Sequence, residues 1–230
     1  MCGRFLLTTP ASGVADLLGL DEAPALSPRY NIAPGQPVAV VRIAGDGDRR
    51  ECVSLRWGLV PSWAPDPGGA ARLINARAET AAHKPSFRAP FRRRRCLVPA
   101  DGFYEWKPAG RRKQPFAFRL RGGGPFALAG LWDRWLGPGG TVLETAALLT
   151  TAANDLVRPV HDRMPVLLRP EAHAAWLDPG RQHAEELLPL LAPFPAELMT
   201  AAAVGAWVSD ARHEGPRCLE PSDGAEPSLL

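Results

Sequence analysis

A cysteine at the second position is the first residue of this chain that could carry chemistry. The chain begins MCGRF, and an initiator methionine is usually removed when the next residue is as small as Cys2. Removal of Met1 would leave an α-amine, with a reference pKa near 7.7–8.0, and a thiol, near 8.5, on one residue. The amine condenses with an aldehyde to an imine, and the thiol can then close a five-membered thiazolidine ring. The alternative is a small residue at a frayed terminus.

Two polar side chains in LINARAET, Asn75 and Arg77, stand where a strand passes into a helix. In extended backbone the two side chains would face the same side. An amide can hold a substrate oxygen or an amine, and a guanidinium can hold a phosphate. Asn75 could instead cap the helix that follows.

Two titratable residues could move protons in such a reaction. Glu105 lies in the aromatic run GFYEW, where loss of hydration raises the pKa of a carboxyl group and suits it to general acid–base catalysis. His161 lies in RPVHDRMPV, and an imidazole exchanges protons near pH 7. Glu105 could equally face outwards from an alternating strand, and His161 could be structural, with its neighbour Asp162 paired to Arg163.

Basic and aromatic side chains indicate a nucleic-acid partner. The net charge is only +3, but residues 84–95 carry six cations and no acid. Guanidinium groups suit contacts with phosphate, although such a run can also be a solvated face. In WGLVPSW, Trp63 follows Pro61 in a loop and could stack on unpaired bases, whereas Trp57 is expected in the core.

The pattern of short apolar runs predicts an α+β protein. Strands are expected over 37–44, 51–56, 95–99, 102–107, 115–120, 126–132 and 142–151. Helices are expected over 76–83, 171–177, 182–191 and, introduced by Thr9 and Pro10, 11–20. Many strands and few helices favour a single domain with a twisted, partly barrel-like β core and peripheral helices. We place this domain at residues 1–220 and a loose tail at 221–230.

Cysteine spacing and hydropathy argue against several other classes of protein. The four cysteines have none of the paired spacings of zinc ligands, so neither a metal nor a cofactor is expected. The longest apolar runs are too short to span a bilayer, and no signal sequence is evident. We therefore expect a cytoplasmic protein with reduced cysteines, and Cys52 and Cys96 are expected in the core.

Taken in order, these stretches resemble the SOS response-associated peptidase (SRAP) family. The resemblance covers roughly Met1 to Pro170 and is carried by MCGRF, RYNIAPGQ, WGLVPSW, INARAET, CLVPADGFYEW, LLTTAAN and HDRMPV. It is weaker near the C-terminus, where the family usually has an asparagine after an apolar pair and this chain has Ser209.

The resemblance implies a DNA-repair protein that binds single-stranded DNA and traps abasic sites. Cys2, unmasked by loss of Met1 through self-processing, would form a thiazolidine with the aldehyde of the ring-opened sugar. Asn75 would orient the amine or the sugar, Glu105 would move protons, and His161 would assist ring opening and reversal. The DNA path would be lined by Arg4, Pro34, Trp63, Arg77 and Trp106, with Thr150 and Thr151 near the reacting centre.

Two other functions remain open on the sequence alone. Cys2 and His161 could act as a peptidase on other proteins. The chain could also be a noncovalent module that binds single-stranded DNA without chemistry. For the DNA-binding functions we expect a monomer with no membrane partner, cytoplasmic and associated with the nucleoid when bound to DNA.

Overall fold

The structure is built from short strands and a few short helices. The computed structural model describes residues 2–45, 47, 49–68 and 73–222. The strands are β1 (Phe5–Leu7), β2 (Arg29–Ile32), β3 (Pro37–Ile43), β4 (Arg50–Trp57), β5 (Asn75–Arg77), β6 (Arg95–Ala100), β7 (Gly102–Ala109), β8 (Arg112–Leu120), β9 (Phe126–Leu136), β10 (Val142–Ala152), β11 (Arg163–Pro165), β12 (Leu167–Leu168) and β13 (Met199–Ala203). The α-helices are α1 (Ala11–Leu18), α2 (Ala78–Ala81), α3 (Arg88–Arg93), α4 (Pro170–Leu177) and α5 (Ala184–Leu187).

Five of the strands close into a barrel. Strand β10 pairs in parallel with β4 and antiparallel with β9, and the antiparallel pairs β4–β3, β3–β6 and β6–β9 complete the ring. The short strands β5 and β11 add to β10, and β12 adds to β9. Buried apolar side chains such as Trp57, Leu97 and Leu128 fill the core, as expected of so small a barrel. The predicted α+β fold with a barrel-like core is confirmed.

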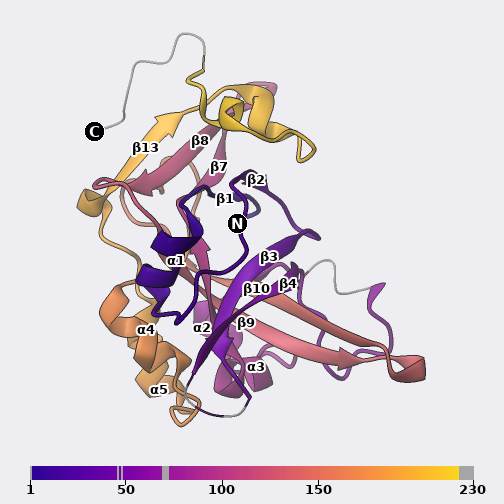
Figure 1. Ribbon diagram of the computed structural model, residues 1–230. Helices are drawn as coiled ribbons and strands as arrows, with labels where there is room; N and C mark the ends of the chain where they lie inside the picture. Colours follow the sequence, from indigo (N-terminus) through magenta and orange to yellow (C-terminus); the bar gives the residue numbers. More distant parts are fainter. Residues whose placement is uncertain (1, 46, 48, 69–72, 223–230) are drawn as a thin grey trace.

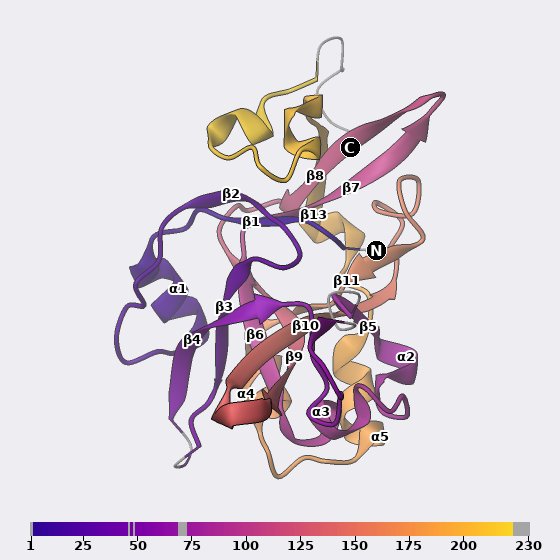
Figure 2. The same cartoon turned by 90° about the vertical axis from the view of Figure 1, so that its right-hand side faces the viewer.

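A second, antiparallel sheet carries the N-terminal strand. Its order is β13–β8–β7–β1–β2, and the ring of Phe5 meets that of Trp57 at 5.2 Å, edge to face, where this sheet adjoins the barrel. Figure 2 shows the leading end of β1, the β7–β8 hairpin, β5 and β11 gathered on one side of the molecule. Residues from both sheets therefore meet beside the N-terminal strand.

The helices lie around the barrel, and α4 contacts the barrel strand β6 (Figure 1). Trp176 of α4 is buried, donates a hydrogen bond of 2.9 Å to the carbonyl oxygen of Cys96, and contacts the ring of Phe91 in α3. Cys96 is buried as expected, whereas Cys52 is half-buried. Among the described residues, no helix combines the length and apolar character that a bilayer crossing requires.

Several helix predictions were right about position and wrong about an end. Helix α1 ends at Leu18 because Gly19 takes a left-handed conformation, with φ of 60°, that glycine adopts at little cost. Its hydroxyl-bearing neighbour Thr9 does not cap it and instead donates to the buried carboxylate of Asp101. The segment predicted as one helix over 182–191 is α5 followed by a tighter 3₁₀ turn at Leu188–Leu191, because Pro189 cannot donate an amide hydrogen bond.

Other elements were not predicted. The short strands β1, β2, β11, β12 and β13 and the basic helix α3 were missed, and the helix expected over 76–83 begins only at Ala78. The described residues of the predicted tail include Pro221, which forms an isolated bridge with Val204. Residues 223–230 of that tail and Met1 lie outside the described residues.

Candidate active site

Cys2 lies just ahead of β1, and its side chain is fully buried at the main core. Asn75 Nδ2 donates a hydrogen bond of 2.8 Å to the carbonyl oxygen of Cys2, which ties residue 2 to β5. Burial raises the pKa of the Cys2 thiol far above its ordinary value, and the nearby Glu105 carboxylate raises it further. The thiol is therefore protonated at neutral pH, and residue 2 is held by the fold rather than frayed.

Asn75 and Arg77 share one side of β5, as the extended backbone predicts. The residue between them, Ala76, is buried, and β5 pairs in parallel with β10. Arg77 is exposed and is itself the N-cap residue of α2, so Asn75 does not cap that helix. Within the described part of the chain, Asn75 Oδ1 is buried and accepts no hydrogen bond, which leaves an acceptor beside Cys2.

Glu105 lies on β7 with only 4% of its surface exposed, so the alternative of an outward-facing glutamate is wrong. Burial raises the pKa of its carboxyl group, and the positive charge that His161 can carry opposes this rise. On the facing strand β8, Phe116 lies directly opposite Glu105. Glu105 therefore has the environment of a proton carrier, in which the neutral carboxylic acid persists to higher pH than in water.

His161 lies in the loop between β10 and β11. Its Nδ1 accepts a hydrogen bond of 2.9 Å from the backbone amide of Arg163 and lies 2.9 Å from the carboxylate of Asp162. One nitrogen cannot accept the first contact and donate the second, so the proton on the ring decides which of the two contacts is a hydrogen bond. Arg163 pairs with Glu79 at 2.7 and 2.9 Å, and Asp162 contacts His161, so the alternative pairing of Asp162 with Arg163 is not formed.

A cleft of about 690 Å³ brings four of the predicted residues together. Those residues are Arg4, Glu105, Trp106 and His161. The remaining lining residues are Gly3, Arg112, Lys113, Ala206 and Ser209. Cys2 and Asn75 do not line the cleft themselves, but Gly3, the chain neighbour of Cys2, does, and Asn75 is bonded to the Cys2 carbonyl group. Sequence reasoning missed Arg112 and Lys113, although the acid-free run KPAGRRK was a visible signal.

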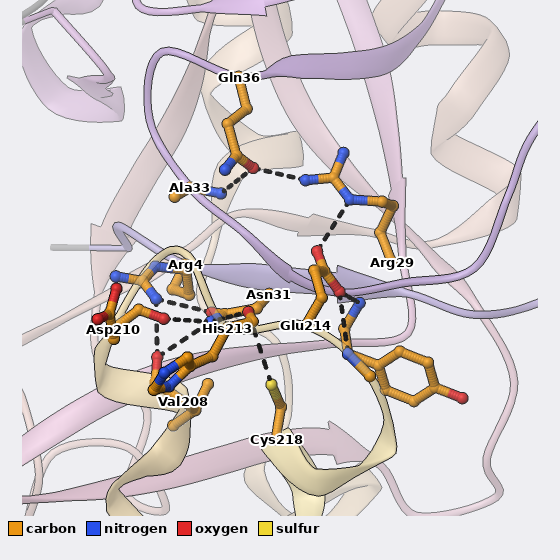
Figure 3. Close-up of polar contacts among 12 residues, drawn as sticks. Arg4, Arg29, Asn31, Ala33, Gln36, Val208, Asp210, His213, Glu214 and Cys218 are labelled. Atoms are coloured by element: carbon orange, nitrogen blue, oxygen red, sulfur yellow. Dashed lines mark hydrogen bonds and ion pairs between the residues drawn. The ribbon is translucent and has the colours of Figure 1, made fainter.

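The C-terminal segment forms one wall of the cleft. Arg4 donates to Asn31 Oδ1 at 2.7 Å and to the carbonyl oxygen of Val208 at 2.8 Å, and Asn31 Nδ2 in turn reaches three carbonyl groups of residues 208–213 (Figure 3). The Trp106 indole donates to Ser209 Oγ at 3.0 Å. Ser209, where the family motif departs, therefore contacts a predicted DNA-path residue, and Arg4 has a structural role besides any contact with DNA.

The other predicted DNA-path residues do not line this cleft. Pro34 and Arg77 are exposed, and Trp63 exposes 62% of its surface. Thr150 and Thr151 are buried in β10, and the Thr150 hydroxyl lies 3.5 Å from the carbonyl oxygen of Ala76. Thr150 thus contacts the strand that carries Asn75, and neither threonine lines the open cleft.

The arginine-rich run is divided between structure and solvent. Arg95 is buried, and its guanidinium donates to the carbonyl groups of four residues, Trp176, Phe91, Arg92 and Asp178. Arg94 pairs with the buried Asp133 at 3.1 Å. Arg92 and Arg93 are exposed, and Arg92 lines a different hollow, beside α5. Figures 1 and 2 place α3 at the end of the molecule that is far from the β7–β8 hairpin, and no arginine of this run lines the cleft.

Comparison with known proteins gives this geometry a context. The family model described as SOS response associated peptidase (SRAP) matches residues 1–211. The abasic site processing protein YoqW of Bacillus subtilis is 39% identical over 224 residues, which cover 96% of this chain and 99% of that protein. The abasic site processing protein HMCES of Gallus gallus is 34% identical, covering 84% of this chain and 66% of that protein.

The fold is shared with solved structures as well. A crystal structure of a Bacteroides thetaiotaomicron protein matches with a TM-score of 0.85 at 27% identity, covering 96% of this chain and all of that one. The family match reaches beyond Pro170, where the sequence resemblance weakened, into the segment that forms a wall of the cleft. The chain belongs to the SOS response-associated peptidase (SRAP) family.

Proposed function

We propose that this protein binds single-stranded DNA and traps abasic sites as a covalent thiazolidine at Cys2. The observation that carries the proposal is the hydrogen bond from Asn75 to the Cys2 carbonyl group, which holds the N-terminal residue beside the cleft of Glu105 and His161. Relatives named abasic site processing proteins support the substrate. The protein would act as a monomer in the cytoplasm, on the nucleoid.

The proposed chemistry needs the free amine of Cys2, and self-processing at this residue would remove Met1. The amine adds to the aldehyde of the ring-opened sugar, and loss of one water leaves an imine. The thiol then adds to the imine carbon, forming a C–S bond, while its proton passes to the nitrogen. These reaction steps need no oxidant or reductant and break no bond of the DNA backbone.

Glu105 and His161 have the properties that these proton transfers require. Because burial raises the pKa of Glu105, a larger share of the neutral acid is present to protonate the departing hydroxyl group. The carboxylate so formed can then take the thiol proton. His161 lines the same cleft, and its imidazole is a second group that can exchange a proton during the opening and closing of the sugar ring.

The same environment argues against a cysteine peptidase that acts on other proteins. Such a nucleophile works as a thiolate, with its pKa lowered by a positive partner. The pKa of Cys2 is instead raised by burial and by Glu105. A buried, protonated thiol suits intramolecular addition to an imine better than attack on a peptide bond of another chain.

One experiment tests the proposal and separates it from a noncovalent module. The protein is incubated with a single-stranded oligonucleotide that carries one abasic site, and the mixture is analysed by denaturing electrophoresis. We expect a crosslinked species with wild type and with the control Cys52→Ala, a half-buried cysteine that does not line the cleft, but none with Cys2→Ala. A wild-type yield from Cys2→Ala would overturn the thiazolidine. Retention of DNA without any covalent species would identify a noncovalent module.

A further inference from the structure

A row of exposed cations stands on the tip of the β7–β8 hairpin. Residues 107–113 hold four cations and no acid, and all seven residues are exposed. We call the four cations the basic arm: Lys107, Arg111, Arg112 and Lys113. None of them forms an ion pair with a carboxylate in the described part of the chain. Their charges are therefore available to a partner.

The basic arm is continuous with the candidate active site. Arg112 and Lys113 line the same cleft as Glu105 and His161. In the hairpin register Lys113 lies opposite Pro108, three residues beyond Glu105. At about 3.3 Å per residue, the arm starts at Lys107, roughly 7 Å from Glu105 along β7, and runs outwards. A polymer that enters the cleft on this side must pass the arm.

We propose that the basic arm binds the phosphodiester backbone of the strand that flanks the abasic nucleotide. The inference deepens the proposed function, on which it rests, by naming what the protein requires beyond the damaged sugar: a flanking strand of DNA. The lining of the cleft holds three cations, Arg4, Arg112 and Lys113, against one acid, Glu105, so the balance of charge gives the cleft a positive potential.

The distance of the basic arm from Glu105 decides whether the arm contributes to DNA binding or to the chemical step. Arg112 and Lys113 lie along the hairpin away from Glu105, so they contact phosphates and not the reacting carbon. Phosphate contacts supply affinity that is independent of base sequence and depends on salt. The arm should therefore strengthen binding of damaged and undamaged single strands alike and leave the chemical step unchanged.

The test uses the double variant Arg112→Gln/Lys113→Gln and three probes. With an undamaged single strand that spans cleft and arm, the slope of log affinity against log salt should become shallower by about 1.4, since each contact contributes about 0.7. With the same strand carrying an abasic site, the half-saturating DNA concentration should rise while the maximal crosslinking rate stays within about threefold of wild type. With free deoxyribose, which carries no phosphate for the arm to bind, the reaction rate should not change.

A matched control separates the arm from net charge. Arg92→Gln/Arg93→Gln removes the same two charges from exposed positions of α3, outside the cleft, and should keep the wild-type slope. An unchanged slope in the arm variant, or an equal loss in the control, would overturn the inference. The undamaged strand reports on the arm without any crosslink, whereas absence of a wild-type crosslink would instead refute the proposed function.

Discussion

The hydrogen bond between Asn75 and Cys2 allows the positioning of the reactive residue to be measured apart from its chemistry. Asn75→Ala removes the 2.8 Å bond and leaves the Cys2 carbonyl group without that donor. The free energy of unfolding should fall by about 1–3 kcal/mol, the cost of leaving a buried acceptor unsatisfied. The rate should fall more than that bond alone implies, because a shift of about 1 Å at a reacting group can cost roughly 100-fold.

The two effects are read in separate assays. Urea unfolding gives the stability change, and single-turnover crosslinking at saturating abasic DNA gives the rate. Trp176→Phe is the control, since it removes a 2.9 Å hydrogen bond to a backbone carbonyl on the α4 side of the barrel, and it should lose stability without loss of rate. A rate for Asn75→Ala within about threefold of wild type, despite the stability loss, would show that Asn75 only braces β5.

Three further predictions concern proton transfer and DNA contact. Glu105→Gln should slow crosslinking by about 10²–10⁴-fold at unchanged DNA affinity. Because the pKa of Glu105 is raised in the folded state, the stability that this residue contributes is present at low pH and is lost as pH rises through that pKa. The Glu105→Gln variant should therefore melt at a higher temperature than wild type at pH 8. The difference in melting temperature should shrink towards pH 4. His161→Ala should slow reversal of the crosslink more than its formation; equal effects on both rates would remove His161 from ring opening. Wild type should show a salt slope of about −2 to −3.5 on single strands and weaker binding to duplex, and Arg77→Ala should make the slope shallower by about 0.7 for every sequence; an unchanged slope would place Arg77 outside the DNA path.

The strong periodic segments of the fold were predictable, and the elements that position the site were not. Long strands such as β9 and β10 are predictable because their sequences contain continuous apolar runs. Strand β5 has only three residues, and its pairing with β10 spans more than seventy positions of the chain. Local propensity therefore assigned Ala76 and Arg77 to the helix, whereas tertiary pairing placed them in a strand.

Site residues with unusual chemistry were predictable, and their surroundings were not. The carboxylate of Glu105 in an aromatic run suggested a buried acid, and it is buried. The density of positive charge over residues 84–95 suggested contacts with phosphate. Arg95 instead donates hydrogen bonds to backbone carbonyl groups, and no local sequence pattern reveals these partners. The contact of Trp106 with Ser209 joins positions about one hundred residues apart, so only the folded chain assigns Ser209 to the cleft.

The order of the two bond-forming steps follows from the burial of Cys2 and is open to a direct test. Because burial and Glu105 raise the pKa of the thiol, the amine is the nucleophile available at neutral pH, and the imine should form before the ring closes. Cys2→Ser keeps the amine and nearly the size of the side chain but offers a hydroxyl group that closes the ring poorly.

The serine variant should therefore accumulate an imine. Added borohydride should convert it to a stable crosslink at a rate close to that of wild-type crosslink formation, whereas without reductant little should survive denaturing electrophoresis. Cys2→Ala under the same reductant is the matched control and should be captured as well, because it too retains the amine. If neither variant yields a reducible adduct, the thiol and not the amine makes the first bond, and the burial of Cys2 does not set the order of the reaction.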